Sequence, residues 1–395
     1  MNESQSAVSP PDNVVTVPVR NRMIAPDILR LFACFSVISI HFFLNSKFYD
    51  EPIAGANMMI MLVARLFFST CVPIFMILTG YLMVNKPLSA KHYGKGMKIV
   101  WLYLLATLAV VIYRLYIKHS LPDWEAAFWG TLRYNAAPYA WYVEMYLGLY
   151  LLIPFLNILF KNLPSKRWRL ALIFTCFALS SLPKLINVYN FTLEGWWENP
   201  TLSTEYQKLI PQWWMFGYPV TFYFIGCYLR EHGIQWNKWI RRGVLVASLT
   251  AYTLYCLWRA HGGKFPWGQW TDWEFALTML NATMLSSLML DKQYRHMPRI
   301  PAKVIGYLSG LSLQIFLVSY IFDTEFYPKI IEKIPKIPER MWSYFWVVPA
   351  IFFLSIAVSI VIDLIYRLFY WIYRLIRDKI KSSRAKNKAN APDDT

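Results

Sequence analysis

Charged residues are scarce in this sequence. Only 16% of its 395 residues are Asp, Glu, Lys or Arg, whereas 56% are hydrophobic and 18% are aromatic. An average soluble domain carries about 25% charged residues. The composition therefore excludes an ordinary soluble domain and predicts a polytopic membrane protein.

Cysteine is also rare, and its spacing argues against two common roles. The chain has five cysteines, all of which lie in apolar stretches. No two of them form a CxxC pair or a spacing typical of metal ligands. We predict no metal site and interpret the cysteines as small buried apolar residues. They are Cys34, Cys71, Cys176, Cys227 and Cys256.

Linkers and several catalytic motifs are missing as well. The sequence has no HExxH, GxSxG or P-loop pattern, so nothing in it indicates a metal-dependent or covalent serine mechanism. It has no long Gly/Ser linker and no visible internal repeat. We predict a disordered cytoplasmic leader at 1–22, one membrane domain at 23–372 and a basic cytoplasmic tail at 373–395.

The apolar residues gather into about ten runs, most of them long enough for an α-helix to cross roughly 30 Å of hydrocarbon. An all-α membrane protein with about ten transmembrane helices is therefore expected. The runs cover residues 23–44, 58–84, 97–117, 139–160, 170–186, 213–229, 243–258, 273–290, 304–322 and 342–366.

Loops rich in basic residues alternate with loops that have few of them. This alternation predicts the orientation of the chain in the membrane. Every second loop is rich in Lys and Arg, and the positive-inside rule places such loops in the cytoplasm. Both termini are then cytoplasmic, and the formal net charge of +17 reflects topology and contact with the bilayer, without a nucleic-acid partner. The basic loops hold Lys86, Lys91, Lys95 and Lys98; Lys161, Lys166, Arg167 and Arg169; Arg230, Lys238, Arg241 and Arg242; and Lys292, Arg295, Arg299 and Lys303.

The first run carries two ionisable residues on one helical face. Arg30 and His41 are eleven residues apart, close to three helical turns, so they lie about 16 Å apart along one stripe. Cys34, Val37 and Ile38 between them suggest an apolar conduit. Alternatively, Arg30 snorkels to the membrane surface and His41 is an ordinary interfacial residue.

Further candidates lie on the cytoplasmic side. Lys95 and Lys98 are one turn apart at the predicted cytoplasmic mouth, where they would pair with phosphates of a nucleotide donor or serve only as topology signals. Pro73 predicts a kink in the second run, and Thr79-Gly80 predicts close backbone approach.

Other candidates lie near the predicted outer surface. Glu144 would orient the histidine, bind an acceptor hydroxyl or cap a tyrosine cluster. Arg65 would pair with Glu144 or contact an anionic glycan. Trp141 and Tyr142 belong to an aromatic outer belt that is typical of membrane interfaces and also compatible with sugar stacking.

Five segments in this order resemble acyltransferase family 3 of bacterial membrane proteins. They are the Arg30-x10-His41 element led by Asp27, "VPIFMILTGYLM", the Lys95/Lys98 pair, "WYVEMYLGLYLLIPFLN" and "YPVTFYFIGCYLRE". The similarity is greatest to the branch of surface-polysaccharide O-acetyltransferases typified by the enterobacterial common antigen O-acetyltransferase.

This resemblance implies an inner-membrane enzyme that moves an acetyl group, or another short acyl group such as succinyl, from cytoplasmic acyl-CoA to an outward-facing glycan or lipid-linked glycan. Acyl-CoA is then a donor substrate, and no bound cofactor is expected. The resemblance makes His41 the catalytic base and places Arg30, with Asp27 and the two lysines, at the acyl-CoA site.

Three positions depart from the family pattern. Lys95 and Lys98 stand where relatives often have arginines, which keeps the charge but loses bidentate phosphate binding. Ser319 stands where relatives often have a histidine. No role is therefore carried over to that position.

A transporter is the main alternative function. In that case Arg30, His41, Glu144 and Asp363 would form a proton relay or substrate path. Such a protein would need broken helices near the membrane midplane and a repeated half. Prolines in the second, fourth and sixth runs would supply breaks, but no second copy of the Arg/His stripe is present.

Overall fold

The computed structural model describes residues 23–292, 294 and 297–389, so the predicted leader lies outside the described residues. These residues form helices and no strands, which confirms the predicted all-α class. The α-helices are α1 (Ile24–Asn45), α2 (Gly55–Phe68), α3 (Cys71–Met83), α4 (Ala90–Tyr116), α5 (Trp124–Leu132), α6 (Trp141–Asn162), α7 (Lys166–Ser180), α8 (Leu182–Ile186), α9 (Tyr218–Glu231), α10 (Lys238–Ala260), α11 (Ala276–Leu290), α12 (Arg299–Gly310), α13 (Ser312–Lys333) and α14 (Tyr344–Ala389).

Every predicted apolar run falls on helix, but not every helix is long and apolar enough to cross a membrane. Within the described ranges five segments qualify, or six if α12 and α13 count as one broken span. Helices α7, α9 and α11 have 15, 14 and 15 residues, which corresponds to only about 22 Å. The number of ten crossings and the orientation of the termini stay predictions. The qualifying segments are Ile24–Asp50, Gly55–Met83, Ala90–Tyr116, Trp141–Asn162 and Ile337–Ile380.

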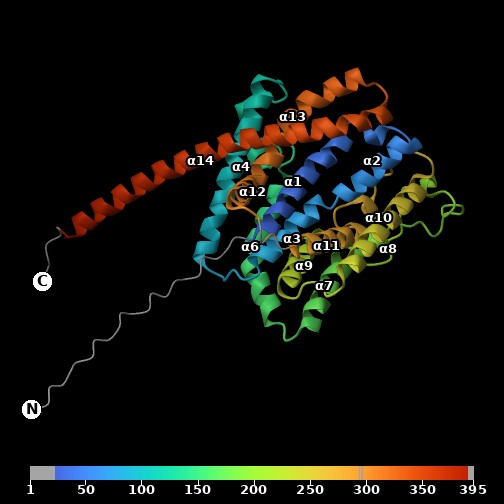
Figure 1. The fold of residues 1–395 in the computed structure, drawn as a ribbon, viewed down its shortest axis with the longest axis horizontal. Coiled ribbons are helices and arrows are strands. Elements are labelled where there is room, and N and C mark those ends of the chain that lie inside the picture. The colour runs from blue at the N-terminus through green and yellow to red at the C-terminus, as the bar shows by residue number, and fades with distance from the viewer. Residues whose placement is uncertain (1–22, 293, 295–296, 390–395) are drawn as a thin grey trace, which may run out of the picture.

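Helix α1 lies at the centre of the bundle (Figure 1). It contacts α2, α3, α11, α12, α13 and α14. Leu29 and Ala33 pack into one apolar core with α3 and α9, whereas Ile38 and Phe42 pack into a second core with α2, α13 and α14. A helix that is apolar on all sides is expected to be buried in this way. The central position of α1 fixes both of its ionisable residues relative to the other helices.

The second predicted run is broken into α2 and α3. The helix ends at Phe68 and restarts at Cys71, and the hydroxyls of Ser69 and Thr70 donate to the carbonyls of Leu66 and Phe67. The helix is therefore interrupted three residues before Pro73, which itself lies in the first turn of α3. A proline there costs no helical hydrogen bond, because the first turn has no acceptor within its own helix.

The ninth predicted run is also broken, at Leu311. Helices α12 and α13 meet there at a bend of 67°, without a proline. Both halves pack on α1. The bend exposes Gly310 and Ser312 to a cavity described below.

Helices α3 and α9 approach each other closely through two glycines. A Cβ atom added to Gly80 would lie 1.9 Å from the carbonyl oxygen of Tyr223, and one added to Gly226 would lie 2.0 Å from that of Ile77. No side chain fits at either position, so each glycine is required by the backbone of the opposite helix. The close approach predicted at Thr79-Gly80 is confirmed.

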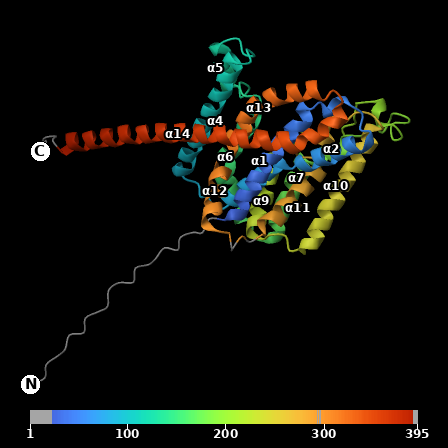
Figure 2. The same ribbon diagram turned by 45° about the horizontal axis from the view of Figure 1, so that its top comes forward.

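Helix α14 projects well beyond the bundle (Figures 1 and 2). It runs without interruption from Tyr344 to Ala389, so the predicted boundary between domain and tail at 372/373 falls inside it. Near the point of exit the carboxylate of Asp363 accepts hydrogen bonds from Arg367 on the same helix and from Tyr307 on α12. These contacts fasten α14 to α12.

Candidate active site

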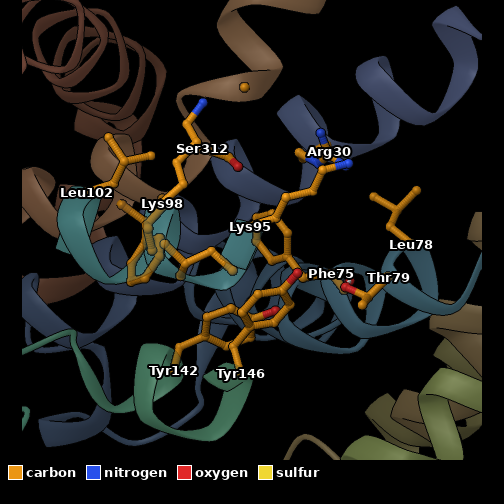
Figure 3. A pocket seen from close by; sticks show the side chains of 14 residues that line it. Arg30, Phe75, Leu78, Thr79, Lys95, Lys98, Leu102, Tyr142, Tyr146 and Ser312 are labelled. Carbon is orange, nitrogen blue, oxygen red and sulfur yellow. Dashed lines mark hydrogen bonds between the residues drawn. The ribbon is translucent and has the colours of Figure 1, made fainter. Parts of the chain in front are cut away.

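A cavity of about 260 Å³ lies where α1, α3, α4, α6 and the α12–α13 bend meet. Its polar groups include three basic side chains, Arg30, Lys95 and Lys98, and the rest of its lining is largely apolar and aromatic (Figure 3). The structure thus brings together the three cations that the sequence placed on the donor side. We call the part of the bundle around them the Arg30 end and the part around His41 the His41 end.

Arg30 is held in place by a neighbouring carboxylate. Its guanidinium lies 3.9 Å from Asp27, one turn earlier on α1, and the hydroxyl of Ser309 on α12 donates to the same carboxylate. The Arg30 side chain keeps 26% exposure, whereas Asp27 is buried. Asp27 therefore positions Arg30 and does not line the cavity itself.

The two lysines bring positive charge without a matching acid. Lys95 and Lys98 are exposed and, three residues apart on α4, lie on the same helical face. The Nζ atom of Lys98 lies 5.5 Å from the ring of Tyr366 on α14, and neither lysine forms an ion pair with any described residue. Together with Arg30 they create a field that favours an anion.

A second polar cluster surrounds His41. The Nδ1 atom of His41 lies 3.4 Å from Oδ2 of Asp323, and its ring stacks on Tyr139 with 3.8 Å between centroids. The hydroxyl of Tyr139 donates to Oδ2 of Asp323 over 2.7 Å. The His41 side chain is 12% exposed and Asp323 1% exposed. Nδ1 is not aligned for a hydrogen bond, as is common for catalytic groups before substrate binds.

The cationic cavity and the His41 cluster lie at opposite ends of parallel stretches of α1 and α13. Eleven residues separate Arg30 from His41, and eleven separate Ser312 from Asp323, which is about 16 Å on each helix. The thiol of Cys34 on α1 donates to the carbonyl of Ser312 on α13. Arg30 and His41 thus lie on one unbroken helix, three turns apart, as the sequence predicts.

The cavity stops short of the His41 cluster. Its lining includes Tyr142 and Phe316 but neither His41 nor Asp323. Cys34 and Ile38, predicted to line a conduit, are fully buried in the core. A continuous apolar conduit along the α1 stripe is therefore not open in this structure.

Glu144 is not the carboxylate beside the histidine. It is exposed, and its carboxylate forms no hydrogen bond or ion pair with the described part of the chain. Asp323 occupies the position that Glu144 was expected to take. Ser319, at the place where relatives often carry a histidine, is buried and donates to the carbonyl of Phe316 in its own helix.

Arg65, in the last turn of α2, is buried among residues of the loops that follow α1 and α10. Its Nε donates to Tyr49, its Nη2 donates to the carbonyl of Thr271, and its guanidinium lies 4.7 Å from the Phe265 ring centre. Its Nη1 has no hydrogen-bond partner among the described residues. The expected pairing with Glu144 does not occur.

The remaining predicted residues divide between the two ends. Trp141 stacks on Trp273, with 6.2 Å between ring centres and 12° between planes. Tyr142, predicted on the acceptor side, lines the same cavity as Arg30. Asp363 is tied to Arg367 and Tyr307, which leaves it no position in a relay with His41.

Sequence reasoning missed Asp323 and Tyr139. Asp323 lies near the outer end of the ninth apolar run, at the depth of His41 if both helices run in the same direction. Tyr139 comes two residues before α6, at the start of the fourth predicted run, and the sequence predicts no role for it. The predicted depth of Asp323 could have marked it as a possible partner of His41. Contact between the first and ninth runs, however, cannot be derived from spacing within the sequence.

Comparison with known proteins identifies the family. The chain matches the family model described as an acyltransferase domain over residues 23–364, which is most of its length. No curated protein and no solved structure matches the chain. The matched range includes all three cavity cations and the His41 cluster, and the chain therefore belongs to this family of membrane acyltransferases.

Proposed function

We propose that the protein transfers an acetyl group, or another short acyl group, from acyl-CoA to a hydroxyl of a surface glycan or lipid-linked glycan. The observation that supports this most strongly is the arrangement of two sites along α1. A cationic cavity lies at the Arg30 end, and a His–Asp–Tyr cluster lies just past its opposite end.

The cavity suits a donor that has a polyanionic head and an uncharged arm. Arg30, Lys95 and Lys98 would hold the phosphates of CoA, and the apolar and aromatic walls would take the pantetheine arm. Lysine binds phosphate as a point charge, without the fixed geometry of arginine. The two lysines therefore contribute attraction, and Arg30, fixed by Asp27, contributes orientation.

The His41 cluster suits a general base. With Asp323 next to Nδ1, the neutral imidazole carries its proton on that nitrogen, and Nε2 is free to accept one. Nε2 takes the proton of the acceptor hydroxyl while the oxygen attacks the thioester carbonyl carbon. The C–S bond then breaks, and the imidazolium returns the proton to the departing thiolate. Asp323 stabilises the imidazolium, and Tyr139 holds both groups in place.

The acceptor would bind above this cluster. The parallel rings of Trp141 and Trp273 offer a flat face to a sugar. Arg65 is buried and would contribute positive charge to this side without touching the glycan. In the predicted orientation this side faces away from the cytoplasm. The protein would then act in a bacterial inner membrane, with donor and acceptor on opposite sides.

The test is transfer of labelled acetyl from acetyl-CoA to lipid-linked or polymeric glycan in membranes. Wild type should transfer the label, and His41→Ala should lose transfer by at least about a hundredfold. His119→Asn is the control, since His119 lies in an exposed loop at a positive φ that Asn tolerates. Full transfer by a folded His41→Ala protein would refute the base assignment. Glycan movement across the membrane without acyl-CoA would instead support the transporter.

A further inference from the structure

Three aromatic rings close the end of the cavity that faces His41. Tyr142 of α6 packs against Phe75 of α3 with 5.7 Å between ring centres, and against Phe316 of α13 with 5.9 Å. All three line the cavity. We call this group the aromatic wall.

The position of the wall follows from the helices that carry it. Tyr139, one turn before Tyr142, stacks on His41. Phe316 is the cavity-lining residue of α13 nearest in sequence to Asp323. The aromatic wall therefore separates the cavity from the His41 cluster, whereas the three cations lie toward the other end.

We infer that Tyr142, as part of this wall, determines which acyl groups the enzyme accepts; this rests on the proposed function. If the cations hold the CoA phosphates, the thioester arrives at the opposite end, and its acyl group meets the wall. A group that continues to His41 has to pass the edge of the Tyr142 ring. Rings packed from three helices leave no room for a long chain.

The wall also bears on charge. Its three side chains are aromatic, and no basic residue belongs to it. Because the CoA phosphates engage the three cations of the cavity in the proposed binding mode, the carboxylate of a succinyl group would lose its hydration at this end without a free cationic partner. The accepted acyl group is therefore short and uncharged.

Tyr142 is the member of the wall that is best suited to substitution. It lies in the first turn of α6 and is only partly buried, whereas Phe316 is in the buried core. Tyr146 provides a matched control, since it stacks on Tyr142 and lines the same cavity (Figure 3). It lies one turn further along α6 and thus further from Tyr139, which stacks on His41.

The experiment compares acetyl-, butyryl-, hexanoyl- and succinyl-CoA as donors for purified wild type, Tyr142→Ala, Tyr142→Phe and Tyr146→Ala. Wild type should prefer acetyl over butyryl by at least about tenfold in kcat/KM. Tyr142→Ala should remove that preference, and Tyr142→Phe should keep it because the ring and not the hydroxyl forms the wall. Tyr146→Ala should keep the preference for acetyl.

A second readout is hydrolysis of acetyl-CoA without acceptor. Tyr142→Ala should raise it several-fold, because an opened wall admits water from the His41 cluster. If Tyr142→Ala does not fold, Tyr142→Leu, which keeps part of the apolar contact, should accept butyryl about as well as acetyl.

The possible outcomes distinguish failure of this inference from failure of the proposed function on which it rests. If wild type transfers no acyl group from any donor, the proposed function is wrong. If wild type transfers acetyl and the Tyr142 variants lower kcat/KM for all donors by the same factor, only the role of Tyr142 in selection is refuted. An equal change of preference in Tyr146→Ala would also refute it, because selection would then not depend on the wall.

Discussion

Asp323 on α13 and His41 on α1 are 282 residues apart in the sequence, yet Oδ2 of the first lies 3.4 Å from Nδ1 of the second. Tyr139 connects them, since it stacks on the imidazole and donates to the carboxylate. A carboxylate in this position fixes the tautomer of the histidine and stabilises its protonated form during transfer.

Asp323→Asn should therefore lower kcat by about a hundredfold to ten-thousandfold with little change in the KM for acyl-CoA, because the amide cannot stabilise the imidazolium. Initial rates of acetyl transfer at varied acetyl-CoA would measure both constants. Glu325→Gln is the control, since Glu325 lies two residues further on α13 and pairs with Tyr113 and Lys118. Equal rates for Asp323→Asn and wild type would contradict the role of Asp323.

The cavity lysines should act on donor binding alone. Replacing Lys95 and Lys98 together by Gln should raise the KM for acetyl-CoA by about tenfold or more and leave the KM for acetyl-pantetheine, which lacks the nucleotide phosphates, unchanged. Lys91→Gln is the matched control, because Lys91 is exposed on the same helix and does not line the cavity. A parallel rise for both donors would show that the lysines support structure and do not contact phosphate.

Binding of the acceptor should depend on Trp141, and binding of the donor should not. Trp141→Ala removes one ring of the stacked pair with Trp273 and should raise the KM for glycan several-fold while the KM for acetyl-CoA stays constant. Trp168→Ala, on exposed α7, should change neither constant. An effect of Trp141→Ala on the donor alone would place this ring on the wrong side of the reaction.

Loss of the close glycine contact between α3 and α9 should destabilise the fold. Gly80→Ala places a methyl group 1.9 Å from a carbonyl oxygen, so the helices must separate and the thermal midpoint in detergent should fall by many degrees, or the protein should not accumulate. Gly148→Ala, on a helix where a Cβ would meet no atom within 4 Å, is the control and should be neutral or slightly stabilising. Equal midpoints for the two variants would show that the helices can separate at low cost.

Periodicity within one helix was predictable, but contact between distant helices was not. The stripe of Arg30 and His41 and the close approach at Gly80 depend on local spacing, and both appear in the structure. The partner of the histidine does not depend on local spacing. Glu144 and Asp323 both lie near the predicted outer ends of their helices, and only tertiary packing decides which of them meets the imidazole.

The position of Tyr142 was missed for a related reason. It starts a helix, and depth in the membrane alone suggests an outer residue. The ring nevertheless points into the cavity, because Phe75 and Phe316 pack against it. The order of loops and helices yields only a predicted depth, whereas the direction of the side chain depends on neighbours from two other helices.

The two glycines of α3 and α9 have a mechanical consequence for the cavity. Phe75, Leu78 and Thr79 form its α3 side, within one or two turns of Gly80. Because the backbones of α3 and α9 are in direct contact, this side has no room to yield toward α9. We therefore expect a donor in the cavity to be accommodated on the opposite side, where the Nζ atom of Lys98 lies 5.5 Å from the ring centre of Tyr366 on α14.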